Sequence, residues 1–174
     1  MIMNIGVISD THDDINNVKK AIKIFNEHNV DYVIHAGDYV FPGIVLEFGN
    51  LNKNIKFLGV LGNNDGEKIG LANNFQRIGG NIKWDFGEII LDDLSIGIYH
   101  GTNTELTNSL ILGNRFDVFI YGHTHKKDNR VIGKTQLLNP GSAHQDLQKD
   151  EPNNGPSVLI YNTIFKRCEF ILLS

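Results

Sequence analysis

The sequence predicts an α/β domain in which two β-sheets pack on each other with helices on the outside. In the first half, short apolar runs alternate with stretches of helical periodicity, which is typical of a mostly parallel sheet. In the second half, apolar runs come in pairs joined by short links, which is typical of antiparallel hairpins. The chain has 174 residues, a length typical of one domain, so we expect a single domain over residues 1–174.

The first half contains three apolar runs, each followed by a helical stretch. The expected strands are residues 2–8, 31–35 and 55–61, and the expected helices are residues 14–28, 42–49 and 67–76. The first helix has apolar residues at helical spacing and either Asp13 or Asp14 at its N-cap. Pro42 suits the first turn of the second helix, because an N–H there would lack an intrahelical partner.

The second half is richer in paired strands. The expected strands are residues 84–91, 94–99, 116–121, 130–132, 135–138, 158–162 and 165–173, with one helix over 105–113. Asp92-Asp93, Gly133-Lys134 and Thr163-Ile164 are the expected hairpin links. We expect Asn139-Pro140-Gly141-Ser142 to form a turn, and the polar stretch 145–156 to form a loop.

Composition and charge narrow the classes of function. Hydrophobic residues make up 41% and charged residues 21% of the chain, which is ordinary for a globular protein. The net charge of −4 argues against a nucleic-acid partner held by bulk positive charge. Cys168, the single cysteine, cannot form an internal disulfide and is interpreted as a small core residue.

The same features predict a cytoplasmic protein. No basic region precedes the first apolar run, and Asn4 and Gly6 interrupt that run, so we expect no signal peptide. No apolar run approaches the roughly 18 residues that a membrane span needs, so we expect no membrane partner. One lone cysteine fits a reducing compartment.

Two histidines, His123 and His125, flank Thr124 at the end of the apolar run 116–121. In an extended backbone, residues i and i+2 point to the same face, so we expect both imidazoles to aim at one point. A His-x-His pair just past a strand favours metal ligation, whereas His28 is interpreted as a surface residue or a core residue with satisfied hydrogen bonds.

Polar residues of the metal-ligand type follow five of the apolar runs. They are Asp10 and His12, Asp38, Asn63 with Asp65, His100, and His123 with His125. In open α/β sheets, ligands bind at the carboxyl ends of the strands. Carboxylates, imidazoles and an amide without a thiolate suit two ions of higher coordination number, with Mn, Fe, Ni or Zn chemically suitable. Asp38 stands alone after its strand and is our choice for the carboxylate that bridges the ions.

These motifs resemble those of the calcineurin-like metallophosphoesterases, and their order and spacing are most similar to the small single-domain phosphodiesterases. The resemblance spans residues 5–142 and includes Asn139-Pro140-Gly141-Ser142. It implies a four-layer αββα sandwich of two mixed β-sheets flanked by helices. It also implies a homodimer as one option, because small relatives are often dimers.

The resemblance implies a ligand for each position of a two-metal site. One ion would be held by Asp10, His12 and His125, the other by Asn63, His100 and His123, with Asp38 between them. Manganese is common in such small members and is the first expectation for the cofactor, with nickel, iron or zinc as alternatives.

Asn64 departs from the broader family pattern, in which many members have a histidine that protonates the leaving group or steadies the phosphate. An amide cannot act as a general acid, but Asn64 could donate a hydrogen bond to a phosphoryl oxygen. We therefore assign Asn64 a catalytic and substrate-binding role. Asp65 is assigned a supporting role, orienting a histidine or the backbone. His144, just after the Asn139–Ser142 turn, is a candidate for the missing acid.

The expected function is a dinuclear-metal-dependent phosphodiesterase that hydrolyses a small phosphodiester by in-line attack of a metal-bound hydroxide. One alternative is a phosphomonoesterase using the same site. The motifs contain no arginine for the extra charge of a monoester, and Lys126 and Lys127 are interpreted as a solvated strand edge. A non-catalytic binding scaffold on the same fold is the other alternative, although all seven ligand positions are retained.

Overall fold

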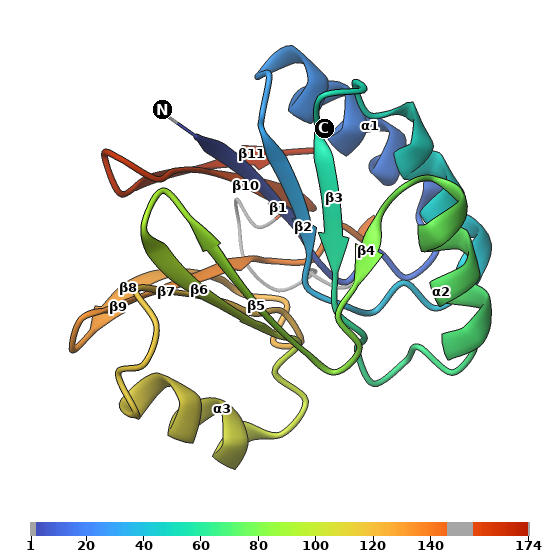
Figure 1. Cartoon of the computed structure of the whole chain (residues 1–174). Helices are drawn as coiled ribbons and strands as arrows, with labels where there is room; N and C mark the ends of the chain where they lie inside the picture. The colour runs from blue at the N-terminus through green and yellow to red at the C-terminus, as the bar shows by residue number, and fades with distance from the viewer. Residues whose placement is uncertain (1–2, 146–154, 174) are drawn as a thin grey trace.

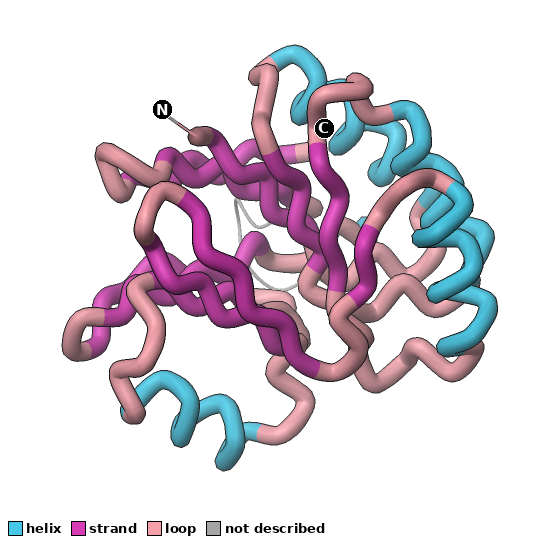
Figure 2. The backbone as a smooth tube through the Cα atoms, in the orientation of Figure 1, coloured by secondary structure: helices cyan, strands magenta, loops and turns pink. Residues whose placement is uncertain are grey.

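The structure is a computed structural model that describes residues 3–145 and 155–173, and two β-sheets lie face to face at its centre (Figure 1). The tube view shows the strands of both sheets between helices on either side (Figure 2). No helix in the described ranges is long and apolar enough to cross a membrane.

The first sheet has six strands in the order β11-β10-β1-β2-β3-β4. Their bounds are β1 (Asn4–Ile8), β2 (Tyr32–His35), β3 (Lys56–Gly59), β4 (Asn81–Ile82), β10 (Ser157–Asn162) and β11 (Arg167–Leu172). Strands β1 to β4 pair in parallel, whereas β10 pairs antiparallel with both β1 and β11.

The second sheet has five strands in the order β5-β6-β7-β9-β8. Their bounds are β5 (Phe86–Leu91), β6 (Leu94–Tyr99), β7 (Val118–Ile120), β8 (Lys127–Ile132) and β9 (Thr135–Pro140). Strands β6, β7 and β9 pair in parallel, and β5 and β8 are antiparallel edge strands.

Three α-helices and one 3-10 helix form the outer layers. They are α1 (Ile15–Glu27), η1 (Pro42–Asn50), α2 (Lys68–Arg77) and α3 (Thr104–Leu112). Asp14 is the N-cap of α1, because its side chain accepts a hydrogen bond from the backbone N–H of Asn17 at 3.0 Å.

Three apolar clusters separate the four layers. The first fills the space between the first sheet and its helices, where Phe25 of α1 and Phe75 of α2 are buried. The second lies between the sheets and includes Val7 of β1 and Ile120 of β7. The third joins Ile111 of α3 to the outer face of the second sheet. The four-layer αββα sandwich of two mixed sheets is therefore confirmed.

Several local predictions need correction. The division into a parallel first half and an antiparallel second half is wrong, because β6, β7 and β9 are parallel and the C-terminal strand β10 joins the first sheet. The stretch after Pro42 is a 3-10 helix, and the two-residue strand β4 was not expected. Asn139 and Pro140 belong to β9 rather than to a turn. Of the expected loop, residues 146–154 lie outside the described residues.

Cys168 on β11 is half-buried and packs against the cluster between the sheets, and burial raises the pKa of its thiol. The predicted small core residue thus lies at the border of the core and is not fully buried.

Candidate metal centre

The predicted ligands follow the carboxyl ends of β1, β2, β3, β6 and β7, and the backbone there is left-handed rather than extended. The φ angles are 54° at Asp10, 39° at His12, 61° at Asp38, 63° at His123 and 57° at His125. Such angles are uncommon outside glycine and cluster at functional sites. The extended-backbone argument for the His-x-His pair is therefore wrong, and the two imidazoles lie beside different neighbours.

Two groups of side chains have ligand atoms that all lie within 4.8 Å of one another. One contains Asp10, His12 and His125, and the other contains Asp10, Asp38 and His100. Asp10 is common to both groups. Asp38 also lies close to a histidine of each group, because its Oδ2 is 3.5 Å from His12 Nε2 and 3.3 Å from His100 Nε2.

Three buried polar atoms in these groups lack a hydrogen-bond partner within the described part of the chain. They are Asp10 Oδ1, His12 Nε2 and His100 Nε2. Asp10 Oδ1 lies 3.9 Å from each of these two nitrogens and 3.2 Å from His125 Nε2. Unpaired buried polar atoms are costly unless a ligand satisfies them. An oxygen and two imidazole nitrogens that face a common space fit divalent cations of the Mn, Fe, Ni or Zn type.

Hydrogen bonds on the outer sides of two ligands leave their inner atoms available. His100 Nδ1 lies 2.7 Å from the Ala36 carbonyl oxygen; donation there leaves Nε2 with a lone pair. Asp10 Oδ2 accepts hydrogen bonds from Ser9 Oγ at 2.6 Å and from the His123 backbone N–H at 3.1 Å. Asp10 Oδ1 is therefore the oxygen presented to a cation.

The charges of the site suit cation binding. Although burial opposes ionisation, the neighbouring His100 imidazole and the hydrogen bonds from Asn64 hold the pKa of the Asp38 carboxyl well below its usual range. Burial likewise opposes protonation of His100, but the Asp38 and Asp10 carboxylates raise the pKa of that imidazole. Burial lowers the pKa of His12 despite the carboxylates of Asp38 and Asp10, and burial also lowers the pKa of His123. Neutral imidazoles and an ionised carboxylate are the forms that bind metals.

The remaining predicted residues, His123, Asn63 and Asn64, each contact a different neighbour. The His123 and His100 ring centroids are 5.2 Å apart. Asn63 Oδ1 accepts a hydrogen bond from Thr102 Oγ1 at 3.3 Å. Asn64 donates twice to Asp38, with its backbone N–H 2.8 Å from Oδ1 and its Nδ2 2.8 Å from Oδ2.

Asp65 is a buried residue next to the site, 2% exposed. It accepts four backbone N–H groups, those of Asp38 at 3.0 Å, Tyr39 at 2.7 Å, Val40 at 2.9 Å and Gly62 at 2.7 Å. These bonds join the loop after β2 to the loop after β3. The partners of Asp65 are thus backbone groups and not a histidine.

Sequence reasoning did not select three hydroxyl residues that support the ligand loops. Ser9 bonds Asp10 as described above, Thr11 Oγ1 donates to the Asp38 carbonyl oxygen at 3.3 Å, and Ser142 Oγ donates to the Asp10 carbonyl oxygen at 2.9 Å. Ser9 and Thr11 alternate with Asp10 and His12 in the sequence. Their position between predicted ligands could have indicated that they support the ligand loop.

Two other histidines adjoin the site. His35 is fully buried, stacks on Tyr39 with ring centroids 3.8 Å apart, and lies 3.2 Å from Thr11 Oγ1 through Nε2. His35 thus contacts the ligand loops after β1 and β2 from beneath. The His144 ring centroid lies 6.0 Å from that of His12, so the loop after β9 borders the centre.

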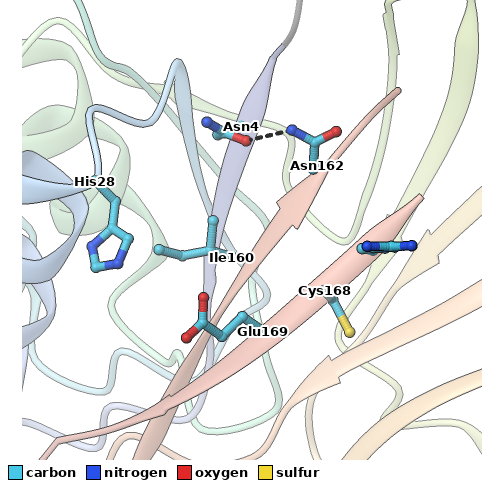
Figure 3. Close-up of a pocket in the computed structure, with 7 residues that line it drawn as sticks. Asn4, His28, Ile160, Asn162, Cys168 and Glu169 are labelled. Carbon is cyan, nitrogen blue, oxygen red and sulfur yellow. Dashed lines mark hydrogen bonds between the residues drawn. The ribbon is translucent and has the colours of Figure 1, made fainter. Parts of the chain in front are cut away.

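His28 lies near the amino-terminal end of β1, at the other end of this strand from the ligand loop, and lines a pocket of about 410 Å³ (Figure 3). Asn4 and Asn162, which bond each other at 2.8 Å, line this pocket at the amino-terminal end of β1. His28 Nδ1 lies 2.9 Å from the Ile24 carbonyl oxygen. His28 is exposed there, so of the two predicted roles, surface residue or satisfied core residue, it has the first.

With the fold and the centre described, comparisons define the class of protein. Residues 3–163 match the model of the calcineurin-like phosphoesterase superfamily domain. The chain belongs to this superfamily and is a metallophosphoesterase, a metal-dependent phosphoric ester hydrolase, as its five motifs predicted.

Individual relatives agree with this assignment. The chain is 43% identical over 140 residues to a phosphodiesterase of Methanocaldococcus jannaschii, covering 80% of this chain and 83% of the relative. It is 32% identical over 148 residues to a probable metallophosphoesterase of Methanothermobacter thermautotrophicus, covering 80% of this chain and 77% of the relative. A solved archaeal phosphodiesterase superposes with a TM-score of 0.88 at 37% identity, covering 97% of this chain and 99% of that one.

Proposed function

We propose that this protein is a phosphodiesterase that uses two divalent ions, with manganese the first expectation and nickel, iron or zinc as alternatives. The ligands would be Asp10, His12 and His125 for one ion, and Asn63, His100 and His123 for the other, with Asp38 between them. The unpaired inner atoms of Asp10, His12 and His100 carry this proposal. The name of the Methanocaldococcus jannaschii relative supports a phosphodiester as substrate.

When bound, two such ions lower the pKa of water to supply a nucleophile and neutralise charge on the phosphoryl group during in-line displacement. The chain's own part is to hold the ligands in place. Asp65 fixes the loop that carries Asp38, and Asn64 fixes the Asp38 carboxylate itself through two hydrogen bonds. We propose that the amide of Asn64 also faces the substrate's phosphoryl oxygens.

The chemistry at Asn64 favours diesters with good leaving groups. An amide cannot donate a proton to a departing alkoxide, so alkyl leaving groups should depart more slowly than aryl ones. A monoester carries an additional charge, and no arginine lies in the five ligand motifs. Comparing kcat/KM for the phenyl monoester and diphenyl diester of phosphate tests this preference; a higher value for the monoester would contradict it.

The central experiment uses protein stripped of metal and then supplied with Mn²⁺. Wild type should hydrolyse bis(4-nitrophenyl) phosphate, and Asp38→Ala should lower kcat/KM by about a thousandfold or more, because it removes the ligand shared by both ions. His28→Ala, which changes an exposed histidine near the amino-terminal end of β1, is the matched control and should retain wild-type rates. Equal rates in Asp38→Ala and wild type would refute the proposal.

A further inference from the structure

A hollow of about 350 Å³ opens beside the candidate metal centre, between the loop after β3, the start of α2 and the loop after β6. Asn63, a predicted metal ligand, lies in its wall next to Thr102, and the two side chains are joined by the 3.3 Å hydrogen bond from Thr102 Oγ1. Because Asn63 belongs both to the wall of the hollow and to the proposed ligand set, the hollow adjoins the proposed metal site.

The wall of the hollow contains apolar and polar side chains, and its two apolar members are fixed in place. Leu61, 3% exposed, belongs to the core cluster beneath the helices. Tyr99 packs against the cluster under α3, and its hydroxyl accepts the Asn103 backbone N–H at 3.1 Å, which fixes its ring. The half-buried ring of Tyr99 is therefore the surface suited to the C–H face of a ring-shaped ligand.

The outer rim carries a donor and an acceptor side by side. Lys68 Nζ lies 3.6 Å from Asp85 Oδ1, and these side chains are 51% and 79% exposed. An ion pair this exposed contributes little to stability, roughly 0–1 kcal/mol, so it can exchange its partners for those of a ligand. Because the pair is neutral as a whole, it does not select a second anion; it suits adjacent hydroxyl groups, which both donate and accept.

From these three surfaces we infer that the hollow binds a sugar ring, such as ribose, that is esterified to the scissile phosphate. The C–H face would lie on Tyr99, and neighbouring hydroxyls would bond Lys68 and Asp85. A carboxylate that bonds sugar hydroxyls is a recurring arrangement in nucleotide-binding proteins. This inference rests on the proposed phosphodiesterase function and assigns the substrate class of the same site.

The kinetic test uses 4-nitrophenyl diesters with one leaving group and different retained alcohols. Wild type with Mn²⁺ should prefer the ribose 5-phosphate diester to the n-pentyl diester. Lys68→Met and Asp85→Asn should each lower kcat/KM for the ribosyl ester about tenfold and leave that for the pentyl ester unchanged, because each removes a charged hydrogen-bond partner of the sugar. Lys134→Met is the matched control. Lys134 is 55% exposed and forms an ion pair with Asp117, with Nζ 3.9 Å from Oδ1, and it does not line the hollow.

A binding measurement separates this inference from the proposed function. In the presence of Mn²⁺, calorimetry should show that wild type binds ribose 5-phosphate more tightly than pentyl phosphate. Lys68→Met should bind these two ligands with equal affinity. The absence of hydrolysis of both esters would overturn the phosphodiesterase, while the ratio of dissociation constants would still test the sugar site. Equal affinities in wild type, parallel losses for both ligands, or glycerol 3-phosphate binding as tightly as the ribose compound would overturn the sugar site.

Discussion

The carboxylate of Asp65 determines the shape of the loop that presents Asp38. Its four backbone donors come from two loops, and two of the residues it holds, Asp38 and Val40, have φ angles of 61° and 75°. Burial raises the pKa of Asp65 even though these N–H groups oppose the shift. A buried carboxylate without hydrogen-bond donors would destabilise this left-handed loop. The four N–H groups supply those donors, and the carboxylate in turn accepts the hydrogen bonds that these N–H groups need.

We therefore expect Asp65→Asn to weaken both stability and metal binding. The amide nitrogen would face backbone N–H groups, which should lower the free energy of unfolding by about 1–3 kcal/mol. Displacement of Asp38 should weaken Mn²⁺ binding by about 10- to 100-fold, the usual effect of removing a residue that orients a ligand. Urea unfolding of the metal-free protein and Mn²⁺ titration measure the two effects.

Asp117→Asn provides the comparison for this substitution. Asp117 Oδ2 accepts hydrogen bonds from the Ser95 backbone N–H at 2.9 Å and from Ser95 Oγ at 2.7 Å, in the second sheet away from the ligand loops. This variant should lose stability but keep wild-type Mn²⁺ affinity. Unchanged Mn²⁺ affinity in Asp65→Asn as well would show that Asp65 does not position Asp38.

At the scale of elements, the loop after β3 approaches the loop after β2 closely enough that only glycine fits at position 62. A Cβ on Gly62 would contact Asp38 Oδ1 and lie 2.5 Å from the Asp38 backbone nitrogen. Gly66 in the same loop has no atom within 4 Å of such a Cβ. A side chain at position 62 would therefore clash with Asp38, whereas a side chain at position 66 would meet no other atom.

Gly62→Ala should abolish most Mn²⁺-dependent activity, because the methyl group would push the Asp38 carboxylate and backbone out of position. We expect a fall in kcat/KM of about 100-fold, in line with misplacement of a reacting group by about 1 Å. Gly66→Ala should behave as wild type in the same assay. Comparable losses in both variants would indicate a general effect on the loop rather than contact with Asp38.

The elements themselves were largely predictable from the sequence, because buried strands are marked by apolar runs and helices by their periodicity. Strand β4 was missed since its two residues leave no pattern, and the 3-10 form of η1 does not differ from an α-helix in apolar spacing at this length. Strand pairing was the harder problem. Nothing local in residues 157–162 indicates that they pair with Asn4 to Val7 at the start of the chain.

The candidate site was predictable as a set of residues but not as a geometry. Seven residues were expected to converge. The structure groups Asp10, His12, Asp38, His100 and His125, whereas His123 belongs to neither group and the position of Asn63 as a ligand stays a prediction. The left-handed φ angles of His123 and His125 were not foreseen, because local sequence does not encode a conformation that tertiary hydrogen bonds impose. The sharing of Asp10 between two groups likewise depends on distances that spacing cannot supply.

At the scale of the whole molecule, the candidate ligands join the two sheets. Asp10, His12 and Asp38 follow strands of the first sheet, whereas His100 and His125 follow strands of the second. A cation bound by both sets can bind only when the sheets are packed together, so metal binding should stabilise the folded state.

Mn²⁺ should therefore raise the unfolding free energy by about 2.7 kcal/mol at a free concentration of 100 times its dissociation constant. Thermal unfolding with and without Mn²⁺, and after addition of a chelator, measures this. The increase should be present in His28→Ala and absent in Asp38→Ala. An equal increase in Asp38→Ala would mean that the ions bind elsewhere.

The position of β1 between β10 and β2 also governs how the chain can fold during synthesis. When β1 leaves the ribosome, β2 soon follows, but the other edge of β1 has no partner until β10, far along the chain, emerges. A nascent chain therefore carries an open edge of unpaired backbone groups until β10 is made, and such an edge is prone to aggregation. The final hairpin of β10 and β11 closes that edge, and only then is the first sheet complete.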